Sequence, residues 1–181
     1  YVLMTKRNGL SSPLATLVEL DNGLPLSVFG GVIVTRAGRS DIAKLADLKG
    51  RTIATPDTGS FGGYQTQAYE LAKAGIRIAD DINLLITGMP HDTALHAVLE
   101  GRADAGFIRT GVLEALIRSG RIEASQVTVL NRKTVPDFPF LLSTGLYPEW
   151  PIAAMPQTDE HLAQDVAKAL FSLQAGHPAA R

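Results

Sequence analysis

The sequence of 181 residues contains no cysteine. Disulfide bonds, thiolate metal sites and a cysteine nucleophile are therefore excluded. The sequence also lacks an excess of one charge, because 17 Lys and Arg residues stand against 18 Asp and Glu residues, for a formal net charge of −1. A nearly neutral chain with scattered basic residues does not indicate binding to nucleic acid or to a charged bilayer surface. No apolar run approaches the roughly 18 residues that a membrane-spanning helix needs.

The residues that are present suffice for a folded core. Hydrophobic residues make up 45% and charged residues 19% of the chain, a composition typical of globular proteins. The length fits one domain, or one domain with part of another. Because the chain begins at Tyr1 and has no signal-peptide pattern, we expect it to be a piece of a longer protein.

Short β-branched runs alternate with amphipathic helical stretches, which predicts an α/β fold with a mostly parallel sheet. The expected strands are residues 31–35, 52–55, 83–87, 103–108 and 127–130. The expected helices are 63–74, 92–100, 111–119 and a last one from Thr158 that buries Leu162, Val166, Ala169 and Leu170. Prolines and aromatic residues between 135 and 156 predict a packed extended segment that leaves one sheet for another, with a boundary there.

The strongest local signal for a binding site is the loop of residues 55–64, TPDTGSFGGY. It joins an expected strand to an expected helix, and its three glycines let the backbone come close to a ligand. The first N–H groups of the helix, with the Ser60 hydroxyl as an extra donor, would hold an anion. The alternative is a tight turn that needs glycine for steric reasons, and the loop alone does not decide between them. Because no Lys follows the glycines, it is not a Walker loop.

Two further strand-to-helix turns are expected at the same edge of the sheet. His91 precedes the helix at 92–100, and Arg109 follows the strand at 103–108. Ligands of open α/β sheets bind at this edge, and an Arg there can pair with a carboxylate or another oxyanion. The alternatives are a capping or surface histidine and an arginine paired with Glu114. The histidines and acidic residues lack catalytic or metal-ligand spacing, so we predict no catalytic residue, no metal and no cofactor.

Together these segments resemble the type II periplasmic binding proteins. Residues 41–54 (DIAKLADLKGRTIA) are similar to the start of the second lobe in that family. The loop at 60–64 resembles the anion loop of the phosphonate-binding branch, and residues 88–92 and 100–106 resemble two further motifs of that branch. In one position the anion loop departs from the pattern, because Gly62 stands where the branch has a second Ser, which removes one hydroxyl donor.

A subgroup of this family is also similar. Residues 138–151, with 29–33 and 109–114, resemble the periplasmic sensor domains of histidine kinases related to the tetrathionate sensor. The subgroup often carries Arg where this chain has Gly145, a difference that bears on specificity. The resemblance covers residues 1–173.

The resemblance implies two α/β lobes hinged around a ligand cleft. Residues 1–28 would be part of lobe 1, residues 29–127 would form lobe 2, and residues 128–181 would return to lobe 1 and end in a helix. The first lobe would be incomplete in this chain. The residues implied to bind ligand are Ser60, Phe61, Gly62, Gly63, His91, Arg109 and, at the cleft of the first lobe, Tyr1.

The function that the resemblance implies is that of a periplasmic, non-catalytic sensor domain of a two-component histidine kinase. It would bind a small oxyanion-bearing solute in the cleft, and its other partner would be the rest of the membrane kinase. The alternative is the solute-binding protein of an ABC transporter for phosphonate- or phosphite-type anions, with a permease as partner. An enzyme of the same fold and a domain that serves only dimerisation remain further alternatives, and a homodimer stays open in each case.

Overall fold

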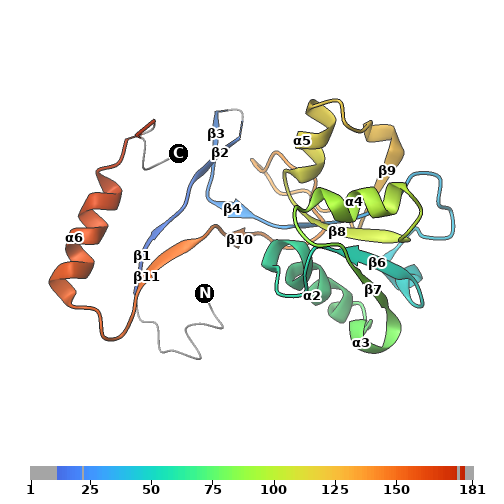
Figure 1. Cartoon of the computed structure of the whole chain (residues 1–181), viewed down its shortest axis with the longest axis horizontal. Helices are drawn as coiled ribbons and strands as arrows, with labels where there is room; N and C mark the ends of the chain where they lie inside the picture. The colour runs from blue at the N-terminus through green and yellow to red at the C-terminus, as the bar shows by residue number, and fades with distance from the viewer. Residues whose placement is uncertain (1–11, 22, 175, 178–181) are drawn as a thin grey trace. The chain divides into compact units, whose positions relative to one another are not determined.

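The computed structural model describes residues 12–21, 23–174 and 176–177, which fall into two compact units. Unit 2 is Phe29–Leu146, and unit 1 contains the described residues of Tyr1–Val28 and Tyr147–Arg181. Unit 2 is a five-stranded sheet with helices on both faces (Figure 1). The fold is mixed α/β, as the composition and periodicity predicted.

The sheet of unit 2 has the strand order β7–β6–β8–β5–β9. The strands are β5 (Gly31–Arg36), β6 (Thr52–Thr55), β7 (Asn83–Ile86), β8 (Ala105–Arg109) and β9 (Val127–Leu130). Each lies within two residues of its predicted range. Strands β7, β6 and β8 are mutually parallel, whereas β5 is antiparallel to both β8 and β9.

Strands β7, β6, β8 and β9 therefore run in one direction, which confirms the prediction of a mostly parallel sheet, and β5 is the one described strand of this sheet that runs against them. The first five of its six residues are buried, so the strand lies in the middle of the core. Strands buried on both faces read as continuous apolar runs, and such a run gives no information on strand direction.

Helices cover the two faces of this sheet. Figure 1 shows α4 (Asp92–Leu99) and α5 (Val112–Arg118) on one side, and α2 (Thr66–Lys73) and α3 (Ile78–Asp81) on the other. One core cluster joins Leu95 and Leu113 to the sheet, and the second joins Leu71 to it. A single π-helical turn at Phe61–Gln65 precedes α2, and short 3₁₀ turns lie at Leu45–Leu48 and Ala124–Gln126.

Residues 128–146 lie in unit 2, although the sequence placed them in the returning first lobe. The reason is a set of buried hydrogen bonds to β5. The Ile33 N–H donates to Ser143 Oγ at 2.9 Å, the Gly31 N–H donates to Thr144 Oγ1 at 2.9 Å, and the Ser143 N–H donates to the Gly31 carbonyl at 2.9 Å. Serine and threonine hydroxyls thus continue the ladder where β9 ends.

Unit 1 consists of small paired strands and one helix. Strand β1 (Ser12–Thr16) pairs antiparallel with β11 (Pro151–Ala154), and β2 (Glu19–Asp21) pairs with β3 (Leu24–Leu26). Strand β4 (Val28–Phe29) pairs with β10 (Tyr147–Pro148), where the chain passes between the units. The predicted packed segment between 135 and 156 thus contains β10 and β11.

The last helix, α6 (Glu160–Phe171), begins two residues after the predicted start at Thr158, and it packs differently. Asp159 caps it, its carboxylate accepting the N–H of Leu162 at 3.1 Å. The predicted burial of its apolar face was wrong, because Leu162 is 57% and Val166 is 37% exposed and neither Ala169 nor Leu170 is buried. The described elements of unit 1 are too few to cover that face.

Candidate anion-binding site

The loop after β6 ends in a capped turn. Ser60 is the N-cap of the π-helical turn, and its Oγ accepts the N–H of Gly63 at 3.1 Å. Thr55 Oγ1 donates to the Gly63 carbonyl at 2.8 Å. This assigns to Ser60 a capping role that the sequence did not predict. Its hydroxyl proton is still available for a ligand, because an oxygen that accepts one N–H keeps its own donor.

A buried glutamine holds the same turn through hydrogen bonds from its side-chain amide. Gln67 is completely buried, and its Nε2 donates to the carbonyls of Gly62 and Ile108, both at 2.9 Å. It thereby ties the loop after β6 to the end of β8. Sequence reasoning missed this residue, although a glutamine on the buried side of an amphipathic helix was a visible signal, because buried polar groups need partners.

Two glycines of the loop are required by close contacts rather than by unusual backbone angles. A Cβ on Gly63 would lie 2.6 Å from Cε1 and 2.8 Å from Nδ1 of His91. A Cβ on Gly62 would lie 2.9 Å from Cε2 of Phe29 and 3.1 Å from Cγ of Arg109. The loop, the turn before α4 and the end of β8 therefore meet, as the order of the three turns predicted.

The surroundings of His91 favour the neutral form of its imidazole, which can donate or accept a hydrogen bond. It lies at the N-cap position of α4, partly buried, and its buried Nδ1 has no hydrogen-bond partner. Burial lowers the pKa of His91, and the positive charge of Arg109 lowers it further, against the opposing effect of Asp92. The lowered pKa favours the neutral imidazole at neutral pH.

Arg109 lies against an aromatic pair. Its guanidinium carbon is 4.6 Å from the centroid of the Phe29 ring, a cation–π geometry. The Phe29 ring meets Phe61 edge to face at 5.8 Å between centroids. The rings hold the head of Arg109 beside the loop. Phe29 is a site residue to which the sequence reasoning gave no role, because only the tertiary fold brings it to the loop.

The structure thus brings six of the seven predicted residues together within unit 2: Ser60, Phe61, Gly62, Gly63, His91 and Arg109. Tyr1 lies outside the described residues. The alternative partner considered for Arg109, Glu114, accepts the N–H of Leu141 at 2.7 Å through Oε1. In the described part of the chain no group of three or more acidic or histidine side chains is arranged to hold a metal ion.

Comparison with known proteins identifies the family. The model of the family described as ABC transporter, phosphonate, periplasmic substrate-binding protein matches residues 1–181. The chain belongs to this family. Members of this family are periplasmic substrate-binding domains. The neighbours with known structures share the type II periplasmic binding fold. None of the helices in the described ranges has the length and hydropathy to cross a membrane.

Individual relatives extend this picture. The tetrathionate sensor histidine kinase of Salmonella typhimurium is 36% identical over 163 residues, which are 90% of this chain and 27% of that protein. XAC2383 from Xanthomonas citri, solved bound to ATP, matches with a TM-score of 0.69 and 20% identity over 93% of this chain. PhnD1 from Prochlorococcus marinus, solved with methylphosphonate, matches with a TM-score of 0.60 and 15% identity over 99% of it. This phosphonate-binding-type chain spans 58% and 63% of those two structures.

Proposed function

We propose that this domain is the ligand-binding part of an extracytoplasmic sensor of a two-component histidine kinase. The observation that carries the proposal is the 36% identity to the tetrathionate sensor kinase across 90% of the chain. The periplasmic family supports a location outside the cytoplasm. The kinase modules themselves lie outside this chain, so signalling would be an activity of the longer protein.

The ligand in this proposal is a small solute with an oxyanion group. The N-terminal N–H groups at Phe61 and Gly62 and the Ser60 hydroxyl would donate to its oxygens. The imidazole of His91, whose lowered pKa favours its neutral form, would add an N–H donor without adding a proton to the anion. The guanidinium of Arg109, stacked on Phe29, would supply the opposite charge and up to two parallel hydrogen bonds.

Specificity in this site would depend on Gly62 and Arg109 together. Gly62 removes the second hydroxyl of the anion loop, and the space of its missing side chain is filled by the Phe29 ring and the stem of Arg109. The anion loop would thus have one hydroxyl donor fewer, with the cation of Arg109 beside it. A site with a full positive charge favours anions of higher charge or with a second oxyanion end over a single phosphonate group.

The signal would come from lobe closure. We propose that unit 2 is the second lobe and that unit 1 is part of the first. A ligand that binds the closed arrangement more tightly than the open one shifts the population toward closure by its differential affinity. This closing step would be transmitted to the kinase.

The alternative function is solute capture for an ABC importer, which the description of the matching family supports. The two functions use the same site and differ in the partner. Ligand-dependent phosphorylation of the longer natural protein would favour the sensor, whereas ligand uptake that depends on a permease would favour the importer.

The first experiment is a thermal-shift screen of the longer natural protein against methylphosphonate, phosphite, sulfonates, tetrathionate, thiosulfate and carboxylates. A ligand at 100 times its dissociation constant adds about 2.7 kcal/mol of stability, which gives a clear shift of the midpoint. The shift should disappear in Ser60→Ala and His91→Gln and persist in Ser119→Ala, which removes an exposed hydroxyl far from the loop. No shift with any of these anions would refute the assignment, and a shift that survives both site variants would place the ligand elsewhere.

A further inference from the structure

Beyond the anion site, the sheet of unit 2 has an open edge at β9. Strand β9 is the last in the order, and among the described residues no strand pairs with its outer side. The Ala37 N–H donates to the Gln126 carbonyl at 2.8 Å, so the backbone of Gln126 faces β5. Because backbone groups alternate along a strand, the carbonyls of Val127 and Val129 and the N–H of Val129 face outward.

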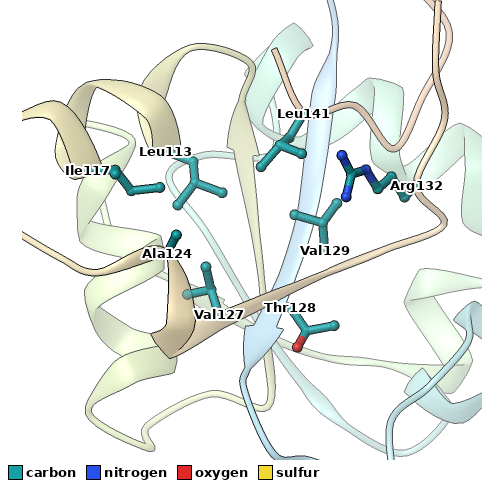
Figure 2. Close-up of a pocket in the computed structure, with 8 residues that line it drawn as sticks. All are labelled: Leu113, Ile117, Ala124, Val127, Thr128, Val129, Arg132 and Leu141. Atoms are coloured by element: carbon teal, nitrogen blue, oxygen red, sulfur yellow. The ribbon is translucent and has the colours of Figure 1, made fainter.

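An apolar depression of about 370 Å³ runs along this edge, between β9 and α5. Its lining is shown in Figure 2 and consists of Leu113, Ile117, Ala124, Val127, Thr128, Val129, Arg132 and Leu141. Val127 and Val129 project to the side on which Leu113 lies, and Thr128 projects away from it. None of the six residues of the anion site lines this depression, so it is a separate surface.

The charges at the two ends of β9 are opposite. Arg132 follows the strand, is exposed, and makes no ion pair with any described residue. Glu123 precedes the strand and is exposed, and among the described residues its side chain bonds only to Ser125 and to the turn that it caps. The neighbouring cations are already paired, Arg121 with Asp92 at 2.9 Å and Lys133 with Glu70 at 2.9 Å.

We propose that this edge is an interface between two copies of the chain, in which β9 pairs antiparallel with β9 of the second copy. With the two-fold axis at Thr128, Val127 of each copy lies opposite Val129 of the other, and their outward N–H and C=O groups bond. Both α5 helices then lie on one face of the continuous sheet, and the two apolar depressions close against each other. The same register brings Arg132 of one copy toward Glu123 of the other.

The self-complementarity of the edge is what selects a second copy as its occupant. An isologous interface needs every group to meet its complement under the same two-fold rotation. A two-fold rotation about Thr128 brings the outward backbone groups of the two copies together, places the two apolar depressions against each other, and brings Arg132 of each copy toward Glu123 of the other. An exposed edge with apolar flanks and no inward charge is otherwise open to unspecific pairing.

The test uses the absence of native cysteine. At the two-fold axis the two Thr128 residues form a non-hydrogen-bonded pair with Cα atoms about 4.5 Å apart. That separation falls within the range of roughly 4.4–6.8 Å for disulfides. Thr128→Cys should therefore give a covalent dimer under mild oxidation, whereas Ile86→Cys, an exposed position on the opposite edge strand β7, should stay monomeric on the same gel.

A second variant tests the interface without a cross-link. Thr128→Lys places two like charges opposite each other at an exposed position, so light scattering should show loss of the dimer while circular dichroism stays unchanged. A monomeric wild-type chain that also fails to cross-link would overturn the proposal. So would a dimer that Thr128→Lys leaves intact, because it would then use another surface.

Discussion

Ser143 offers a quantitative test of how the segment after β9 is held. The residue is completely buried, and its Oγ accepts the Ile33 N–H at 2.9 Å while donating to the Leu130 carbonyl at 2.7 Å. Ser143→Ala leaves both backbone groups buried without a partner. Each such group costs about 1–3 kcal/mol, so we expect the free energy of unfolding to fall by about 2–6 kcal/mol.

The measurement is urea unfolding followed by far-UV circular dichroism, together with amide hydrogen exchange at Ile33. The matched control is Ser119→Ala, which removes a hydroxyl that donates to the Leu116 carbonyl at 3.0 Å on an exposed residue. We expect that control to change stability by less than about 0.5 kcal/mol. A loss below about 1 kcal/mol for Ser143→Ala, with unchanged protection of the Ile33 amide, would refute the bridging role.

The remaining predictions concern the anion site. In Gly62→Ser the new Cβ would lie 2.9 Å from the Phe29 ring, so the midpoint of thermal unfolding should fall by the equivalent of about 1–3 kcal/mol. Adding Phe29→Leu should recover part of this loss. No recovery in the double variant would contradict the steric explanation. Because the pKa of His91 lies below its ordinary value of 6.5, the folded state loses stability as the pH falls through 6.5 and retains it above that value. Stability in urea measured between about pH 8 and about pH 5 should fall less steeply in His91→Gln, and equal slopes would contradict this linkage.

The positions of the sheet strands were predictable because each is a short apolar run between turn residues. In β6, for example, the strand is indicated by the buried residues Ile53 and Ala54, and its end is indicated by the following Pro56. The direction of β5 was not predictable, since a strand buried on both faces has no alternation. Nor was the place of residues 128–146, because Ser143 and Thr144 look like surface residues in sequence and act instead as buried hydrogen-bond bridges.

The candidate site was predictable to the extent that it depends on topology. Successive β-to-α turns of parallel strands come to one edge, which brought the Ser60 loop, His91 and Arg109 together. What the sequence could not reveal were contacts made from outside those turns. Phe29 belongs to the strand segment before β5, and Gln67 belongs to the buried side of α2, so only the folded sheet places them against the loop.

The way in which unit 2 begins and ends has a consequence for how such proteins can be rearranged. The Gly31 N–H bonds to Thr144 Oγ1, and a Cβ on Gly30 would lie 2.9 Å from the Gly145 carbonyl oxygen, so the two ends of the unit are side by side. A module with adjoining ends can be inserted into a host chain, removed from it, or closed by a short linker, without disturbing its core. Unit 2 could therefore be inserted as a whole into another protein, because the host chain would have to be joined to it at only two neighbouring positions.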